Sequence, residues 1–343
     1  MDLDDANCWV NRQRARAWLR AVARGGEGVR AQSFQARGRR VLVMESGRLA
    51  AGQRVDAFLI VRGDFSCGPG CHFEAPIYVA GNCEIGKGSR LESIETDGRL
   101  YLSPSVTVAG NAGSFGPMEI RSSSQVGGRA YSRHSIHLAL RATARDLFAP
   151  RIVTPAGFDE ELPSEPASRR ETAVIPNPNE RLDRGLFRAC GFDPLRLRIR
   201  RGHTWVYDGD LQLLRPVLLG APLVVSGSLA CRPGSLFTGD VTAAGTVAIG
   251  AGSVIRGSLA ARGDVLVGTG CAFQRELRSN QMMRLATGVR GLSGEGPVEA
   301  WAAGEIEIEE DVVIRGRVRS GCAVAATAGV APVSRRFRLA EGL

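Results

Sequence analysis

The chain has 343 residues and a formal net charge of +9, with 44% apolar and 23% charged residues, a globular composition that excludes a disordered chain and predicts two or three structural units. Glycine is frequent, with 43 residues, while aromatic residues make up only 6%, which disfavours a helical bundle and indicates many tight turns. No run approaches about 18 apolar residues, so no transmembrane helix is expected.

Residues 1–39 are predicted to form a basic N-terminal cap, with a helix over Asp5–Arg24. Trp9 and Trp18 lie with aliphatic residues on one side of that helix and arginines on the others. Such a helix would cover the open end of a repeat array, or alternatively contact a membrane surface through Trp9 and Trp18. The acidic start of the chain is not typical of a signal peptide. We therefore expect a cytoplasmic protein, either free or peripheral at the inner membrane.

Residues 40–140 are predicted to form a first β-helical lobe. From Leu59 to Gly88 the chain divides into the hexads LIVRGD, FSCGPG, CHFEAP, IYVAGN and CEIGKG, and glycines recur at every third hexad, as at Gly63 and Gly81. Apolar residues at i and i+2 share one side of a strand, and glycine suits a corner with positive φ. A period of three hexads predicts a three-faced coil. A one-residue slip near Ser93 restarts the register.

Residues 141–204 are predicted to connect two lobes. The segment from Pro155 to Asn179 carries five prolines and a cluster of charges, which is typical of a long connector. A short helix and a basic strand are expected after it. In RLRIRR the alternation places Arg196, Arg198 and Arg200 on one face. These three residues are candidates for contact with lipid headgroups, nucleic acid or an acidic partner, although a solvated edge strand explains them equally well.

Residues 205–330 are predicted to form a second β-helical lobe. From Leu223 nine hexads follow one another, and all their third residues are apolar: Val225, Cys231, Phe237, Ala243, Ile249, Ile255, Ala261, Val267 and Phe273. The pattern stops over Leu277–Pro297 and resumes at Ile306, so Phe273, in the coil before the break, is a candidate assembly residue. Residues 331–343 form a basic tail in which Phe337 and Leu339 are further candidates.

The hexads of Gly227–Gly268 resemble the bactofilins, a family of bacterial polymer-forming cytoskeletal proteins, and Phe58–Gly88 is similar but weaker. The resemblance implies a right-handed β-helix that assembles end to end into filaments without nucleotide, often against the inner membrane. It implies no catalytic residues. Members of that family usually have one β-helical core between short tails, whereas this chain has two lobes and a long connector.

Left-handed hexapeptide acyltransferases are the alternative, because IGKGSR (85–90) and IGAGSV (249–254) fit their repeat. Such enzymes need a histidine base. His72 is expected to face outward from a regular coil, His134 and His137 to end the first lobe, and His203 to begin the second. We expect none of them beside an acidic residue that would orient it.

The eight cysteines form no C-x-x-C pair, and Cys67, Cys71, Cys83, Cys231 and Cys271 fall at inward positions. They are therefore expected to be buried thiols rather than metal ligands. Asp and Glu fall mainly at corners, where they support turns. The sequence thus predicts no metal, no cofactor and no enzyme.

The hypothesis that follows is an all-β, three-faced β-helix in two lobes that self-assembles into a cytoskeletal polymer or scaffold. Its expected partners are other copies of itself, an anionic membrane surface or other scaffold proteins, and nucleic acid is not expected. A capped β-helical scaffold that does not polymerise is a further alternative.

Overall fold

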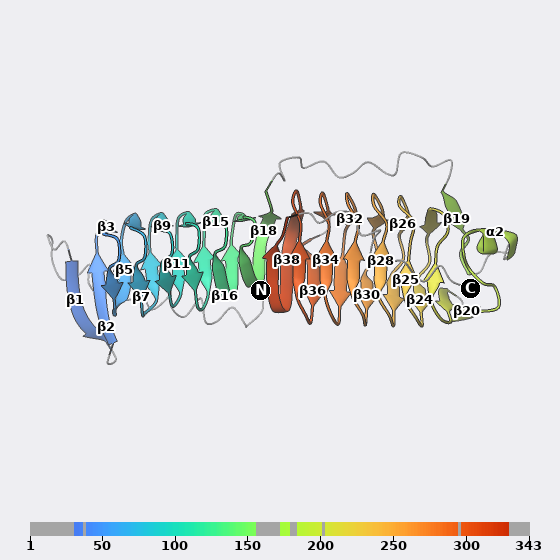
Figure 1. Ribbon diagram of the computed structural model, residues 1–343, viewed down its shortest axis with the longest axis horizontal. Coiled ribbons are helices and arrows are strands. Elements are labelled where there is room, and N and C mark those ends of the chain that lie inside the picture. Colours follow the sequence, from blue (N-terminus) through green and yellow to red (C-terminus); the bar gives the residue numbers. More distant parts are fainter. Residues whose placement is uncertain are drawn as a thin grey trace. The chain divides into compact units, whose positions relative to one another are not determined.

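The structure is a computed structural model, and it describes residues 31–36, 39–155, 172–178, 184–200, 203–293 and 296–328. Their regular secondary structure is nearly all strand, and the strands form parallel β-solenoid coils, about 14 turns in total (Figure 1). The chain divides into two compact units, Met1–Val153 and Thr154–Leu343, named unit 1 and unit 2 here. The predicted all-β fold is confirmed.

The described part of unit 1 contains eighteen strands. They are β1 (Ala31–Ala36), β2 (Arg39–Met44), β3 (Gly47–Leu49), β4 (Arg54–Val55), β5 (Phe58–Val61), β6 (Phe65–Cys67), β7 (His72–Phe73), β8 (Ile77–Val79), β9 (Cys83–Ile85), β10 (Arg90–Leu91), β11 (Ile94–Thr96), β12 (Leu100–Leu102), β13 (Thr107–Val108), β14 (Ala112–Ser114), β15 (Met118–Ile120), β16 (Gln125–Ser132), β17 (Ile136–Leu138) and β18 (Thr143–Val153).

The described part of unit 2 begins with β19 (Ala173–Ile175), the short helix α2 (Arg184–Ala189) and β20 (Leu197–Arg200). The coils then follow as β21 (Thr204–Tyr207), β22 (Leu211–Gln212), β23 (Val217–Leu219), β24 (Leu223–Val225), β25 (Leu229–Ala230), β26 (Leu236–Phe237), β27 (Val241–Ala243), β28 (Val247–Ile249), β29 (Val254–Ile255), β30 (Leu259–Ala261), β31 (Val265–Val267), β32 (Ala272–Phe273), β33 (Glu276–Ser279), β34 (Met283–Leu285), β35 (Arg290–Gly291), β36 (Val298–Ala302), β37 (Ile306–Ile308) and β38 (Val313–Ala326).

In the regular coils each strand pairs in parallel with the third strand along the chain. Leu223 of β24 lies beside Val241 of β27, which lies beside Leu259 of β30, so partners are three hexads apart. The third residues of the nine hexads are buried, except for Cys231, which is half-buried. Alternation therefore turns one apolar side of every strand into the core, as the hexads predict.

The one-residue slip near Ser93 is confirmed by the pairing. Ala112 follows its partner Ile94 by the regular interval of three hexads, whereas Ile94 follows its own partner Ile77 by one residue less. The loss of one residue is taken up between β10 and β11, and the coils continue.

The expected break at Leu277–Pro297 is wrong for most of its length. Leu277 of β33 lies beside Leu259, and Met283 of β34 lies beside Val265, both in the regular register. The interval lengthens only after β35, since Leu277 pairs with Ala300 of β36. Ser279 and Gly291 hold third positions of the hexads here, and their lack of a large apolar side chain is why the sequence pattern stops.

Unit 1 also extends beyond the boundary at residue 140 that the hexads suggested. Thr143–Val153, placed in the connector on sequence grounds, form β18, which pairs with β16 and β17. The short helix and the basic strand expected before the second array are present as α2 and β20. The predicted helix over Asp5–Arg24 lies outside the described residues.

Two kinds of corner glycine support the coils. One kind adopts positive φ at a fixed corner: Gly252 has φ of 63° and Gly270 has φ of 65°, and a Cβ added at either position would have no atom within 4 Å. The other kind lies against the preceding coil: a Cβ added at Gly250 would lie 2.4 Å from the backbone nitrogen of Pro233. The first kind provides a left-handed backbone, and the second provides room for coil contact.

Among the described residues, no helix is long and apolar enough to cross a bilayer.

Candidate functional site

The first coil of unit 1, formed by β2, β3 and β4, leaves two strand edges open among the described residues. β1 pairs antiparallel with β2 and covers that strand. β3 pairs only with β6, and β4 pairs only with β7, among the strands that the structure describes. We call the unpaired edges of β3 and β4 the open edge.

The open edge presents backbone groups from two arginines. The amide of Gly47 donates to the carbonyl of Asp64 and the carbonyl of Leu49 accepts from Gly68, so both residues face β6. Alternation then directs the N–H and C=O of Arg48 away from β6. In β4, the carbonyls of Gln53 and Val55 accept from the next coil, which directs the backbone groups of Arg54 outward. Unpaired strand edges are templates for pairing with another chain.

Unit 2 begins differently, because additional elements cover its first coil. β20 pairs antiparallel with β21, and β19 pairs in parallel with β23. The turn after α2 lies against β22: the amide of Leu214 donates to the carbonyl of Cys190 at 3.0 Å, and a Cβ on Gly191 would lie 2.1 Å from the carbonyl oxygen of Gln212.

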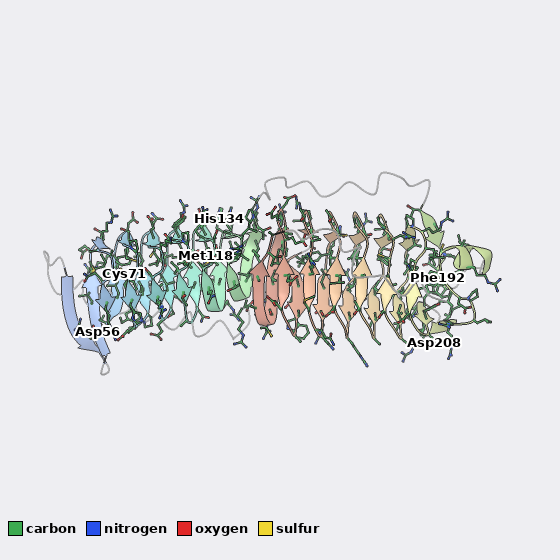
Figure 2. All side chains as sticks on the ribbon, in the orientation of Figure 1. Asp56, Cys71, Met118, His134, Phe192 and Asp208 are labelled. Carbon is green, nitrogen blue, oxygen red and sulfur yellow. The ribbon has the colours of Figure 1, made fainter. Side chains whose placement is uncertain are left out.

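An aromatic cluster holds this cover on unit 2. The ring of Phe187 in α2 lies 5.4 Å from that of Phe192 and 5.2 Å from that of Trp205, centroid to centroid. Phe192, labelled in Figure 2, in turn contacts Tyr207 at 6.0 Å. These ring pairs are edge-to-face and all four side chains are buried, an arrangement that contributes beyond simple area burial. The cluster closes the amino end of the unit 2 coils.

Of the three candidate assembly residues, the structure describes Phe273 alone. Phe273 is fully buried, and its ring lies against Gly291 of the following coil, where an added Cβ would be 2.5 Å from the ring. Because the coils continue past Phe273, it is an internal core residue and the expectation of an assembly contact there is wrong. Phe337 and Leu339, like the membrane-contact candidates Trp9 and Trp18, lie outside the described residues.

Two of the three candidate surface arginines have acidic neighbours. Arg196 lies 3.6 Å from Asp193, and Arg198 lies 2.6 Å from Asp208, whereas Arg200 is exposed. Arg198 and Arg200 belong to β20, the strand that covers β21, and Arg196 precedes it. The basic segment is therefore partly neutralised by acidic residues of its own unit.

One histidine has an acidic neighbour that the sequence analysis did not expect. His72 is exposed on β7, and Nδ1 of His134 lies 3.2 Å from the hydroxyl of Ser135. His137, however, lies on β17 beside Glu119 of β15, one coil earlier. Sequence spacing did not indicate this neighbour, because the two residues are brought together only by coil stacking. Burial lowers the pKa of His137 although Glu119 acts in the opposite direction, and Glu119 itself is paired with Arg99.

The cysteines at inward positions are buried, as predicted, with Cys231 half-buried. Burial raises the pKa of Cys67 to about 11 and that of Cys271 to about 12, and it raises the pKa of Cys83 well above its ordinary value. The thiol of Cys71, a residue labelled in Figure 2, donates to the carbonyl of Ala50 at 3.2 Å. Within the described residues there is no group of three His, Cys, Asp or Glu side chains suited to a metal ion.

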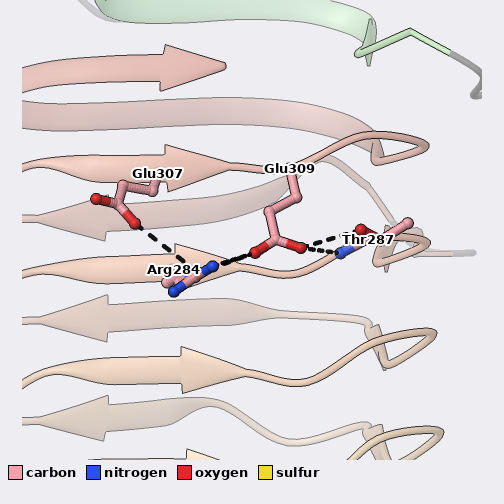
Figure 3. A network of polar contacts seen from close by, with 4 residues as sticks. All are labelled: Arg284, Thr287, Glu307 and Glu309. Atoms are coloured by element: carbon pink, nitrogen blue, oxygen red, sulfur yellow. Dashed lines mark hydrogen bonds and ion pairs between the residues drawn. The ribbon is translucent and has the colours of Figure 1, made fainter. Parts of the chain in front are cut away.

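A buried polar network crosses the last coils of unit 2 (Figure 3). Glu309 accepts hydrogen bonds from Nε and Nη2 of Arg284 at 2.9 and 2.5 Å, and from the amide and hydroxyl of Thr287, both at 3.0 Å. Glu307 lies 3.8 Å from Arg284 on its other side. Both carboxylate oxygens of Glu309 are thus satisfied, and the network joins the coils where the interval between paired strands lengthens.

A shallow groove of about 880 Å³ follows the outer surface of β3, β6, β9 and β12 in unit 1 and includes Asp64, Asn82, Arg99 and Tyr101 in its lining. Its polar groups largely bind each other. Asp64 accepts from the amide of Asn82 at 2.7 Å, and the guanidinium of Arg99 lies 5.7 Å from the centre of the Tyr101 ring. The contact of Asp64 with Asn82 joins two successive coils, a role beyond the support of turns that the sequence predicted for acidic residues at corners.

Comparisons of the chain with protein-family profiles, with curated proteins and with solved structures found no match.

Proposed function

We propose that this chain is a structural protein, bactofilin-like in its hexads, that self-associates without nucleotide through the open edge of unit 1. The function is that of a scaffold rather than an enzyme. The observation that carries the proposal is the first coil of unit 1, in which β3 and β4 are paired on one side only within the described residues.

The coils in this proposal are three-faced and right-handed, with three hexads per turn, and they form two lobes preceded by an N-terminal helix. The pairing of each strand with the third strand along the chain supports three faces. The division into two compact units supports two lobes. A coil of this kind ends in unpaired backbone groups, which is the physical basis for end-to-end association.

The cover on unit 2 limits the kind of assembly. β19, β20 and the turn after α2 occupy the edges that a second copy would need there. One open surface used isologously gives a closed pair, whereas a filament needs two complementary surfaces. We therefore propose a discrete, paired scaffold as the basic assembly. A scaffold in which the first coil of unit 1 is covered as well is the second candidate, and the covered first coil of unit 2 favours it.

The test is sedimentation velocity of the full-length protein without nucleotide, at low and moderate salt, together with negative-stain electron microscopy. Arg48→Pro removes the outward N–H of β3, while Arg48→Ala removes the same side chain and keeps the N–H. Proline is tolerated on strand edges. We expect Arg48→Pro to weaken self-association about tenfold, because a lost hydrogen bond leaves its partner unsatisfied, and Arg48→Ala to stay close to the native protein.

Leu49→Lys provides an independent variant. Leu49 is half-buried on the inward side of the open coil, so lysine can reach water in a single chain but would be trapped in a stacked pair. A native protein that stays monomeric at every concentration refutes self-association and leaves the covered scaffold. A native protein that associates, with all three variants unchanged, refutes the open edge as the contact.

A further inference from the structure

The outward side of β2, β5 and β8 in unit 1 is apolar and closed to water. Five side chains form this outer apolar cluster: Val41, Val43, Phe58, Ile60 and Tyr78, which are 0%, 4%, 7%, 0% and 2% exposed. The partly buried Ala80 packs against them. The hexad pattern does not mark these five residues. The unbroken apolar run Phe58–Val61 is nevertheless a signal, since a strand with one solvent-exposed face should alternate between apolar and polar residues.

These side chains lie outside the solenoid core. Leu59 and Val61 hold the inward positions of β5, so Phe58 and Ile60 point to the opposite side. The register places Val41 beside Phe58 and Val43 beside Ile60, on that same outward side.

The outward side chains of β2 are more buried than its inward side chains. Leu42 and Met44, at inward positions of β2, are only half-buried. Ser66 of β6 and Glu84 of β9, at outward positions of the strands that follow β5 and β8 along the chain, are half-buried and exposed. In the ladder itself, Glu95 of β11 lies beside Tyr78 and is also buried.

Strands of one sheet lie edge to edge, so they cannot cover one another's outward faces. The burial of five outward side chains therefore requires a segment that lies across β2, β5 and β8. The hydroxyl of Tyr78 donates to Asp97 at 2.8 Å, which satisfies its polar atom and leaves its ring as an apolar surface. The cluster is thus a surface suited to a partner with large apolar side chains.

We propose that the segment Asp5–Arg24 of this same chain covers the outer apolar cluster, with Trp9 and Trp18 against it. The sequence pattern of this segment gathers its two tryptophans and its aliphatic residues on one side and its arginines on the others. A segment of this kind can pack its apolar side against the cluster while its arginines stay in water. The proposal does not depend on self-association.

The link between this segment and β1 is long enough to allow this placement. β1 runs antiparallel to β2, and Ala31 lies beside Met44 at the end of the cluster strands. The six residues between Arg24 and Ala31 can span about 20 Å, whereas three adjacent strands are only about 10 Å across. A helix of 20 residues is about 30 Å long, which is enough to cross all three strands.

This placement differs from a cap on the end of the array. A segment seated on the outer face leaves the open edge of β3 and β4 accessible, and it uses the tryptophans that a membrane anchor would need.

The test is limited trypsin digestion of the full-length protein, with cleavage sites identified by mass spectrometry. Trypsin cuts after arginine, and the segment offers Arg12, Arg14, Arg16, Arg20 and Arg24. Ile60→Asp places a carboxylate within the cluster, and Ser66→Asp places one on the outward side of β6, the next strand along the chain, as the matched control. We expect Ile60→Asp to raise the cleavage rate within the segment at least about tenfold and Ser66→Asp to leave it within about twofold, because cleavage follows the population of the open state.

A second variant distinguishes release of the segment from unfolding of the solenoid. Trp18→Asp changes no residue of the coils and should release the segment as Ile60→Asp does, with an unchanged β-sheet circular dichroism signal. Equal cleavage of the native protein and all variants overturns the proposal. Protection that grows with protein concentration overturns it in favour of a second copy, and protection that appears only with phosphatidylglycerol vesicles overturns it in favour of a lipid surface.

Discussion

Replacing Glu309 by alanine should destabilise unit 2 markedly more than replacing its neighbour Glu307. The Glu309 carboxylate accepts four hydrogen bonds from Arg284 and Thr287, and its side chain is only 5% exposed. Its removal leaves the Arg284 guanidinium, which is 16% exposed, without its main partner. Two donors of Thr287 lose their acceptor as well.

The expected magnitude follows from these contacts. Breaking a buried ion pair by removing one partner costs about 3–5 kcal/mol. Arg284 keeps Glu307 at 3.8 Å and is not fully enclosed, so we expect a loss at or just below the lower limit of that range, about 2–3 kcal/mol of unfolding free energy. For a unit of this size that corresponds to a fall in Tm of about 5–10 °C.

The measurement is thermal unfolding followed by circular dichroism, with native-state hydrogen exchange at the amides of β34. Glu307→Ala is the control, because that side chain is 32% exposed and only the more distant partner of Arg284. It should cost less than about 1 kcal/mol. If Glu309→Ala and Glu307→Ala have equal effects, the network does not stabilise the coils and the reasoning is refuted.

Four further predictions concern corners and thiols. Gly252→Ala should cost about 1 kcal/mol through its positive φ alone, whereas Gly250→Ala should cost several times more because its Cβ meets backbone; equal values from urea unfolding would contradict this. Arg141→Gly should stabilise unit 1 by about 0.5–1 kcal/mol in the same assay, since Arg141 adopts φ of 62°, and a loss of stability would disprove the strain. Iodoacetamide at pH 8 should modify exposed Cys322 and spare Cys271. Burial raises the pKa of the Cys271 thiol to about 12. The stability that the protonated thiol contributes is therefore complete below about pH 9 and is lost as the pH rises toward 12. Alkaline unfolding of Cys271→Ala, compared with the native protein, tests this.

The hexads by themselves determined most of the coil register. Apolar residues at Val225, Ala243 and Ala261 recur at every third hexad, and they face the core as strand alternation requires. Even the slip near Ser93 was visible, because the missing residue displaces every later apolar position by one. Local periodicity suffices here since each coil contacts mainly its neighbours.

The tertiary structure decided what periodicity does not encode. The coils continue through the supposed break because stacking accommodates Ser279 and Gly291 at inward positions: the Ser279 hydroxyl donates to the carbonyl of Gly263 at 2.8 Å, and the Phe273 ring fills the space at Gly291.

Side-chain contacts between coils, and the segments that cover the first coils, likewise could not be predicted from the hexads. The partner of Glu309 is 25 residues away in sequence, and no local pattern indicates such a contact. β20 covers β21 while β3 stays open among the described strands. Edge coverage depends on segments outside the repeat, and their positions are set by packing rather than by the hexads.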